Sequence, residues 1–292
     1  MKRQIDPKAI PTKDLHQYII GAVAPRPIAF VSTLDENGVK NLAPYSFFNA
    51  FSSNPPIVVF SSNRRVSNNT TKDTLHNVRV SKECVVNVVP YSIVRQMSLA
   101  SVEFPSEVSE FEAVGLTPQE SVNVAAPGVL ESPVNMECIV KDVIELGEHG
   151  GAGHLIICEV VHISISEDVL NDNRLDPHKL DLMGRLGRNY YVRASGEALI
   201  EIYQSVTEIP LGYGGLPDFI KQSNVLTGND IATLASLKNL PTAAAITAFA
   251  KEYASRVNDL RSLSIFEIHH LASTMIKDGK TDEAMMVLMS IG

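Results

Sequence analysis

The sequence predicts a mainly β fold with added α-helices, in which a β-barrel is followed by a C-terminal helical region. From about residue 18 to 165 the apolar segments are short, rich in Val and Ile, and separated by turn residues, which is typical of strands. After about residue 205 the character changes, and longer segments favour helices. We therefore expect a first domain over residues 1–205 and a helical extension over residues 206–292, with the glycine-rich segment 211–217 as a linker.

Strands are expected in the first domain over residues 27–34, 39–47, 55–62, 83–89, 133–146 and 154–165. Asn37 and Gly38 can supply the positive φ angles of a tight turn between the first two strands. The last strand is apolar on both faces, since Ile157 and Ile163 lie on one face and Cys158 on the other. Such a strand fits a barrel wall that packs against something outside it, such as a second subunit.

Helices are expected in both parts of the chain. Two short ones interrupt the strands, one after Thr71 or Asp73 and the other over residues 92–100. The helices of the extension are expected over residues 216–224, 229–239, 241–257, 264–279 and 281–291. The last two resemble one helical-repeat hairpin, but a stable solenoid needs about three repeats or more, so we expect no repeat array.

The bulk composition argues against several classes of function. A net charge of −8 and a pI near 5.5 disfavour broad contact with nucleic acid or with an anionic membrane. No apolar run approaches the roughly 20 residues that span a bilayer, and the N-terminus lacks the apolar core of a signal peptide. The three cysteines, Cys84, Cys138 and Cys158, lie in apolar strand-like runs without a C-x-x-C pair, so we expect buried, reduced thiols in a cytoplasmic protein. The adjacent His269 and His270 lack the spacing of metal ligands, and no metal site is expected.

The stretch 61–77 has the composition of a phosphate site. Its three basic residues, Arg64, Arg65 and Lys72, outnumber its single acidic residue, so that its charge is +2, and hydroxyl groups accompany them. Free N–H groups, the helix dipole and a lysine at a helix N-terminus all favour a dianion. A solvated loop with an ordinary N-cap is the alternative.

The hairpin 25–50 places hydroxyl and amide groups among aromatic side chains. Ser46 and Asn49 flank Phe47 and Phe48. A flat apolar ring with a polar rim could lie along such a strand and meet these groups with its edge. The ordinary aromatic core of a β-hairpin is the alternative.

Residues 184–191 form a basic loop near the end of the predicted barrel. Arg185, Arg188 and Tyr190 could meet a second anionic ligand, and a solvated basic turn is equally consistent with them. The residues alone leave both interpretations open.

Together these features resemble the flavin reductase-like, FMN-binding split-barrel family, which includes flavoredoxins and the reductase components of two-component monooxygenases. The matching segments follow in order over residues 24–33, 41–61, 72–78, 83–89, 109–117, 131–138 and 185–191. The resemblance covers about residues 15–200. It implies a split β-barrel that binds FMN at the interface of a homodimer.

The resemblance also implies which residues contact FMN. The phosphate or the ribityl chain would be met by Ser32 and Thr33. The ring and its polar edge would be lined by Ser46, Phe47, Phe48 and Asn49. The ribityl chain and the phosphate would also be held by Ser61, Lys72, Asp73 and Thr74, with Arg26 close by. The candidates for substrate contact are Arg185 and Tyr190.

The activity that the resemblance implies is hydride transfer from NADH or NADPH to the flavin. Electrons would then pass to oxygen, to an electron-transfer protein or to a monooxygenase partner. Since the flavin carries the redox chemistry, we expect no catalytic general acid or base. Two features depart from the family: the helical extension has no counterpart in its simple members, and Arg188 stands where a small residue is frequent.

Other interpretations stay open at this point. The protein could be an FMN-carrying electron-transfer protein that a protein donor reduces. It could be a dimeric interaction module that acts through its helical extension. The barrel could also hold another phosphate-bearing ligand, of the haem-related or pyridoxal kind.

Overall fold

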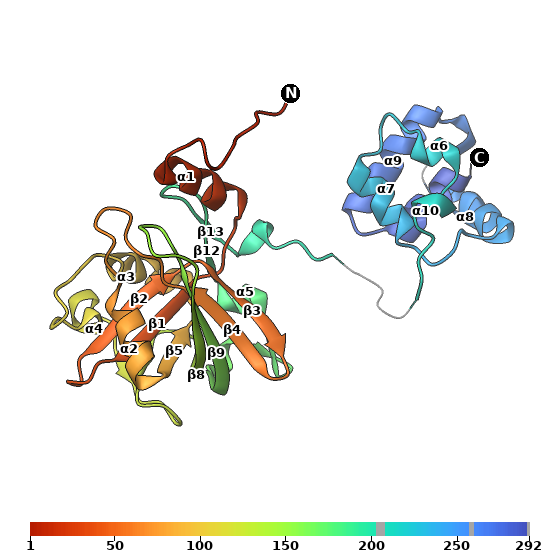
Figure 1. The fold of residues 1–292 in the computed structure, drawn as a ribbon. Helices are drawn as coiled ribbons and strands as arrows, with labels where there is room; N and C mark the ends of the chain where they lie inside the picture. Colours follow the sequence, from red (N-terminus) through yellow and green to blue (C-terminus); the bar gives the residue numbers. More distant parts are fainter. Residues whose placement is uncertain (203–207, 257–259, 291–292) are drawn as a thin grey trace. The chain divides into compact units, whose positions relative to one another are not determined.

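The computed structural model describes residues 1–202, 208–256 and 260–290, and the chain divides into two compact units, Met1–Ile200 and Glu201–Gly292 (Figure 1). The boundary predicted between residues 205 and 206 lies outside the described residues.

The N-terminal unit is built around a curved antiparallel sheet of seven strands (Figure 1). In spatial order these are β2 (Lys40–Tyr45), β1 (Ala29–Leu34), β5 (Glu83–Asn87), β8 (Val134–Glu145), β9 (His154–Ile165), β4 (Pro56–Ser61) and β3 (Phe48–Ser53). Two-stranded ladders are formed by β6 (Pro118–Gln119) with β7 (Gly128–Val129), β10 (Leu170–Asn171) with β11 (Arg174–Leu175), and β12 (Met183–Arg185) with β13 (Tyr191–Arg193). The predicted class, mainly β with added helices, is confirmed.

The turn between β1 and β2 follows from its sequence. The carboxylate of Asp35 accepts a hydrogen bond of 2.6 Å from the backbone N–H of Val39. Gly38 takes a φ of +84°, which residues with a side chain rarely adopt. This turn fixes the register in which Thr33 of β1 lies opposite Asn41 of β2.

Strand β3 was missed in the sequence, where no strand was expected between residues 47 and 55. The chain bends at Ser46 and Phe47 and then pairs with β4, so that Phe48 lies opposite Phe60. Five of the six residues of β3 are exposed. The strand therefore lacks the alternation of apolar and polar residues by which a half-buried strand is recognised.

The main core lies inside the curved sheet, where Phe60, Ile156 and Val86 are fully buried. The three cysteines are free and lie in the same core, which confirms the prediction of buried thiols. A second cluster, on the other face of β1, includes Phe30 and Phe111. Residues of α3 (Val94–Leu99) and α4 (Glu110–Val114) pack into this second cluster.

The helices of this unit agree in part with the prediction. Helix α2 (Asp73–Ser81) begins where a helix start was expected, and α3 lies within the predicted range 92–100. A short helix α5 (Pro177–Leu180) follows β11. Helix α1 (Thr12–Ala22) was not predicted, because only Ile20 among its residues is buried and the segment shows no broad apolar stripe.

The C-terminal unit is helical, as predicted. It contains α6 (Asp218–Lys221), α7 (Gly228–Ala235), α8 (Ala243–Arg256), α9 (Ile265–Lys277) and α10 (Thr281–Met289). Thr227 and Ser264 begin α7 and α9 with capping boxes, which satisfy the free N–H groups of a helix start. None of the described helices is both long and apolar enough to cross a membrane.

The core of the C-terminal unit corrects the predicted linker over residues 211–217. Leu216 is buried in this core together with Ile220 and Leu234, and Leu211 packs against it. The segment is therefore part of the folded unit. Its glycines indicated a linker in the sequence, but its two leucines are core residues.

Candidate functional site

A pocket of about 120 Å³, lined by both cationic and acidic side chains, lies where β2, the start of α2 and the loop after α3 meet. Arg65 and Lys72 are its cationic side chains, and Asp73, Glu103 and Glu110 are its carboxylates. Arg65 is held by hydrogen bonds from its Nη1 atom to the hydroxyl of Thr70 at 2.8 Å and to a backbone carbonyl at 2.7 Å. Its Nη2 atom forms an ion pair of 3.0 Å with Glu103.

The ammonium group of Lys72 is a partly buried cation without an acceptor. Its Nζ atom lies 5.0 Å from the centre of the Tyr45 ring, and within the described residues it makes no hydrogen bond or ion pair. Burial, and then the charge of Arg65, lower the pKa of Lys72 from its ordinary value. A bound anion would offset both effects, because it would supply the acceptor and the opposite charge.

A group of buried hydroxyls lies near this cation. The hydroxyl of Tyr45, whose ring centre is 5.0 Å from Lys72 Nζ, is close to the hydroxyls of Ser62 and Thr74. Burial raises the pKa of Tyr45 to about 12, so its hydroxyl keeps its proton at neutral pH and can donate. Neighbouring hydroxyls can serve one another as donor and acceptor, so the feature that points to an anionic ligand is the ammonium of Lys72, which has no acceptor among the described residues. The residues present therefore fit a phosphate group.

A strip of four residues, Ser46 to Asn49, continues from β2 into β3 and is only partly covered. Ser46, Phe47 and Phe48 are half-buried, and Asn49 is exposed. Phe48 packs against the barrel core, while the ring of Phe47 lies 6.1 Å from that of His16 and 5.8 Å from the guanidinium of Arg26. The strip thus presents two aromatic side chains with a hydroxyl and an amide beside them, as the sequence indicated.

Three predicted contact residues lie in the interior of the protein. Ser32, Thr33 and Thr74 are fully buried. The hydroxyl of Ser32 donates to the carbonyl oxygen of Pro127 at 2.5 Å. Thr33 and Thr74 both donate to Oδ1 of Asn41, at 3.2 and 2.7 Å. Their predicted contacts with FMN stay predictions, since the protein alone does not test them.

Ser61 and Asp73 also use their polar atoms within the protein. Ser61 Oγ donates to Oδ1 of Asn63 at 2.8 Å, and Asp73 Oδ2 accepts from the hydroxyl of Ser106 at 3.2 Å. No side chain caps the N-terminus of α2 in the described chain, so the helix start beside Lys72 keeps free N–H groups. Of the predicted phosphate residues, Lys72 therefore has the clearest geometry for the role.

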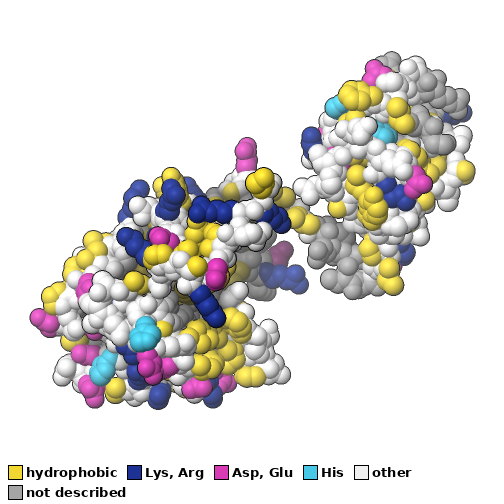
Figure 2. Space-filling view, turned by 45° about the horizontal axis from the view of Figure 1, so that its top comes forward, with side chains coloured by type: hydrophobic (Ala, Val, Ile, Leu, Met, Phe, Trp, Pro, Cys, Tyr) yellow, Lys and Arg dark blue, Asp and Glu magenta, His cyan; other side chains and the backbone are white. Residues whose placement is uncertain are grey.

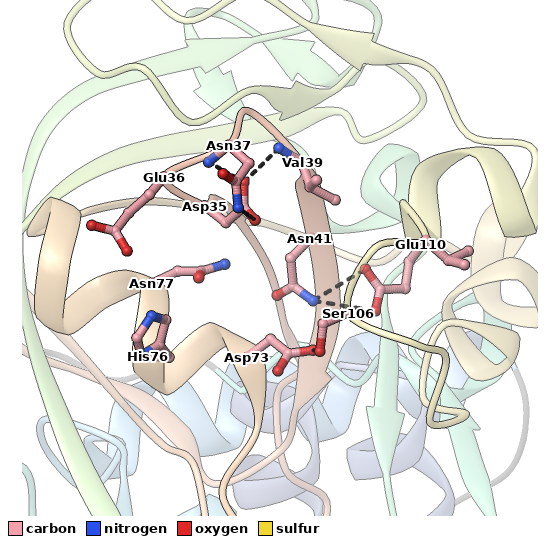
Figure 3. Close-up of a pocket in the computed structure, with 11 residues that line it drawn as sticks. Asp35, Glu36, Asn37, Val39, Asn41, Asp73, His76, Asn77, Ser106 and Glu110 are labelled. Carbon is pink, nitrogen blue, oxygen red and sulfur yellow. Dashed lines mark hydrogen bonds between the residues drawn. The ribbon is translucent and has the colours of Figure 1, made fainter.

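A larger pocket of about 230 Å³ lies on the other side of Asn41 and is acidic (Figure 3). The carboxylates that line it are those of Asp35, Glu36, Asp73 and Glu110. Glu110 is buried and accepts hydrogen bonds from Asn41 Nδ2 at 3.1 and 3.2 Å, and burial raises its pKa. Its lining residues include four carboxylates and no lysine or arginine, so it suits a phosphate dianion less well than the pocket with Arg65 and Lys72.

The candidate substrate residues lie on the hairpin of β12 and β13. Arg185 Nη2 donates to the carbonyl oxygen of Arg188 at 2.6 Å, and its guanidinium lies 4.4 Å from the ring centre of Tyr191. Its charge is thus engaged within the hairpin, whereas Tyr190 is exposed. Their predicted contact with substrate stays a prediction.

The predicted FMN contacts did not include Tyr45, Ser62 or Arg65, although Arg65 was named among the basic residues of the phosphate-like stretch 61–77. All three belong to stretches that the sequence did single out, which was the available signal. Their roles depend on which way each side chain points after β2, β4 and α2 come together, and no local pattern specifies that. The structure places Arg65 and Tyr45 beside Lys72, and Ser62 beside Tyr45.

Comparison with known proteins gives the family. Residues 21–181 match the family described as flavin reductase like domain. An uncharacterized protein of Aquifex aeolicus is 39% identical over 189 residues, which are 64% of this chain and 94% of that protein. Nitrilotriacetate monooxygenase component B from Bacillus cereus is 32% identical, with a TM-score of 0.64 and coverage of 70% of this chain and 99% of that one. The 2-nitrobenzoate 2-nitroreductase NbaA of Pseudomonas fluorescens is 27% identical, with a TM-score of 0.63 and coverage of 72% and 100%.

The chain therefore belongs to the flavin reductase-like family, and the resemblance seen in the sequence is confirmed. The curved sheet of the N-terminal unit matches the split barrel of solved flavin reductases.

Proposed function

We propose that this member of the flavin reductase-like family binds FMN and transfers hydride to it from NADH or NADPH, and that the electrons then pass to an acceptor. The observation that supports this most is the partly buried ammonium of Lys72, which has no hydrogen bond or ion pair among the described residues and lies at the uncapped start of α2. A cation without an acceptor and the free N–H groups of a helix start fit the phosphate of FMN.

Different residues would contact different parts of FMN. Lys72, Arg65 and the free N–H groups at the start of α2 would hold the phosphate, and the strip from Ser46 to Asn49 would receive the ring. Bound FMN supplies the redox chemistry. The side chains of this protein bind it, orient it and exclude water from it, and none is proposed as a general acid or base.

The acceptor is proposed from the related proteins. One is a component of a monooxygenase and another is a nitroreductase. Both names fit an enzyme that transfers electrons to a further acceptor. We propose oxygen, an electron-transfer protein or a monooxygenase partner as the acceptor class.

We further propose a homodimer with the flavin at its interface. Apolar side chains on the outer face of β8 and β9 are exposed, among them Ile144 at 42%, Ile163 at 50% and Ile165 at 40%. Figure 2 shows hydrophobic side chains gathered on the visible face of the N-terminal unit. A row of apolar residues on a sheet face marks an interaction surface, and a second copy of the chain would cover it.

One observation favours a second candidate, an FMN-carrying electron-transfer protein reduced by a protein donor. The guanidinium of Arg185 is engaged by the carbonyl of Arg188 and the ring of Tyr191. It is therefore not free to bind the phosphates of a nicotinamide nucleotide. In that case the flavin would be bound but would not react with NADH or NADPH.

An anaerobic titration of the FMN-loaded protein with NADH and then NADPH tests both candidates. Prompt bleaching of the visible flavin band is expected for the reductase and identifies the donor. A bound flavin that stays oxidised with both nucleotides would overturn the reductase and support the electron carrier. A protein that binds no FMN would overturn both.

A further inference from the structure

The side chain of Arg26 lies where three segments of the N-terminal unit meet. These are the C-terminal end of α1, the tip of the β12–β13 hairpin, and the bend at Ser46 that leads into β3. Arg26 itself is only 5% exposed. Its backbone pairs with that of Arg185 through two hydrogen bonds, of 2.9 and 2.8 Å, which fix its place beside the hairpin.

The guanidinium makes hydrogen bonds to all three segments. Nη1 donates to the carbonyl oxygen of Ile20 at 2.6 Å and also to that of Val23. Nη2 donates to the carbonyl oxygen of Leu186 at 3.2 Å, and Nε donates to the hydroxyl oxygen of Ser46 at 3.3 Å. Four of the five N–H groups of an arginine are thus used within the protein, which leaves little with which to hold an anion.

The bond to α1 satisfies a need of that helix. The last carbonyl groups of a helix have no partner within it, and α1 has no basic residue in its last turn. Arg26 supplies both the donors and a positive charge at the negative end of the helix dipole. The β12–β13 hairpin also approaches α1 closely, since a Cβ atom added at Gly187 would lie 3.2 Å from the Cα atom of Gly21 in α1.

We infer that Arg26 is a positioning residue for the ring-binding strip, and that it acts by locking Ser46 and Phe47 to α1 and to the β12–β13 hairpin. The inference rests on the proposed binding of FMN along this strip. Ser46 is joined to Arg26 by a hydrogen bond, and the Phe47 ring lies 5.8 Å from its guanidinium and 6.1 Å from His16 of α1. Arg26 thus sets the orientation of the hydroxyl and of the aromatic face that would meet the flavin.

The geometry requires arginine in particular. Its planar fork directs N–H groups to acceptors on opposite sides at once, whereas the ammonium of lysine is a compact group with three donors. A lysine at position 26 could reach the end of α1 or Ser46, but it would not span the separate acceptors in the three segments. Arg26→Lys is therefore expected to behave more like Arg26→Met than like the unchanged protein.

The test compares Arg26→Lys, Arg26→Met and Ser46→Ala in the full chain, with Arg95→Lys and Arg95→Met as matched controls. Arg95 is an exposed arginine on α3 whose side chain makes no hydrogen bond, ion pair or ring contact among the described residues. Hydrogen exchange of residues 16–23 reports the attachment of α1. Quenching of flavin fluorescence gives the Kd for FMN, and visible circular dichroism reports the environment of the bound ring.

Both Arg26 variants are expected to accelerate exchange in residues 16–23 at least tenfold, to weaken FMN binding at least tenfold and to change the visible dichroism. Ser46→Ala leaves the attachment of α1 intact, so it is expected to change the dichroism without changing the exchange. The Arg95 variants should match the unchanged protein in all three measurements.

Arg26→Met protein that binds FMN with unchanged Kd and dichroism would overturn the inference, as would an Arg26→Lys protein that behaves as the unchanged one. If Arg26→Met does not fold, Ser46→Ala still decides whether the Arg26–Ser46 bond affects the ring. Unchanged protein that binds no FMN would overturn the proposed function instead, and the exchange measurement would then still decide whether Arg26 holds α1.

Discussion

Arg65 and Glu103 form an ion pair, with Nη2 3.0 Å from Oε1, at the edge of the pocket that contains Lys72. The Glu103 side chain is 63% exposed, and such pairs contribute only about 0–1 kcal/mol to stability. We expect a larger effect of the pair on ligand binding, because the carboxylate engages the guanidinium and adds negative charge where the proposed phosphate would lie. Glu103 thus competes with an anion for Arg65.

Replacing Glu103 by glutamine is expected to strengthen FMN binding. The change frees Arg65 and removes one negative charge, so we expect the Kd to fall by about threefold to tenfold, in keeping with charge interactions near a protein surface. Fluorescence titration at low and at moderate salt measures the Kd for FMN. The difference in Kd between the variant and the unchanged protein should become smaller as salt screens the charges. Glu107→Gln, on the same loop and exposed, should leave the Kd unchanged. Weaker binding by Glu103→Gln would contradict the assigned place of the phosphate.

Lys72→Met should weaken the binding of FMN but not that of riboflavin. Methionine keeps the apolar stem over Tyr45 and removes only the charge. A hydrogen bond to a charged group contributes about 1.5–3 kcal/mol, so the Kd for FMN should rise about tenfold to a hundredfold. Riboflavin, which lacks the phosphate, serves as the internal comparison, and Lys40→Met, at an exposed lysine of the same unit, as the control. An equal loss for both flavins would show that Lys72 supports the ring or the fold.

The sequence predicted the parts of the fold whose stabilising contacts are local or repeat along the chain. Strand β1 was found because its apolar residues pack on both faces, and α2 because a helix start follows the polar loop at Lys72. Helix α1 was missed because only one of its residues is buried and because Arg26, which donates to the carbonyls at its end, lies outside it and also bonds to another segment.

The same limit applies to the site. Lys72 could be predicted, because a lysine at a helix start beside hydroxyls is a local pattern. In the sequence, Tyr45 cannot be distinguished from an ordinary aromatic residue of a strand. Only the pairing of β1 with β2 and the approach of α2 bring its hydroxyl near Thr74 and its ring beside Lys72. Such a position depends on contacts distant in the chain, and no spacing within a segment encodes it.

Ile163→Arg should separate the proposed dimer. Ile163 is half-exposed on the outer face of β9, and a buried, unpaired arginine there would be strongly unfavourable in an interface. Analytical ultracentrifugation is expected to show a dimer for the unchanged chain and a monomer for the variant, with FMN lost as well. Leu175→Arg, a similarly exposed apolar residue on β11, is the matched control and should stay dimeric. A monomeric unchanged chain would rule out the dimer.

Asn41→Ala is expected to destabilise the N-terminal unit by about 2–4 kcal/mol. Asn41 accepts hydrogen bonds from Thr33 and Thr74 and donates to Glu110, so its removal leaves three buried groups short of a partner. Urea unfolding measures the loss. Asn123→Ala removes an exposed asparagine side chain of the same unit and should change the stability by less than about 0.5 kcal/mol. If Asn41→Ala lowered the free energy of unfolding by as little as Asn123→Ala, the buried hydrogen-bond network of Asn41 would contribute little to stability.

His269 is expected to make the C-terminal unit less stable as the pH falls. It is buried in α9, the hydroxyl of Ser223 lies 2.7 Å from its Nδ1, and its Nε2 has no hydrogen-bond partner among the described residues. Because Ser223 Oγ already accepts from two backbone N–H groups, its own proton is directed to Nδ1, and the neutral ring fits the site. Burial lowers the pKa of His269.

Because the folded pKa lies below the unfolded one, the unfolded chain binds the proton more readily. The free energy of unfolding therefore decreases as the pH falls through about 6.5, the ordinary value for histidine. Hydrogen-exchange protection factors for α9, compared between pH 7.5 and pH 5.5 on a scale corrected for intrinsic rates, should fall in the unchanged chain and stay level in His269→Gln. His270→Gln, at the exposed neighbour, should retain the fall. The same pH dependence in His269→Gln would assign it to another group.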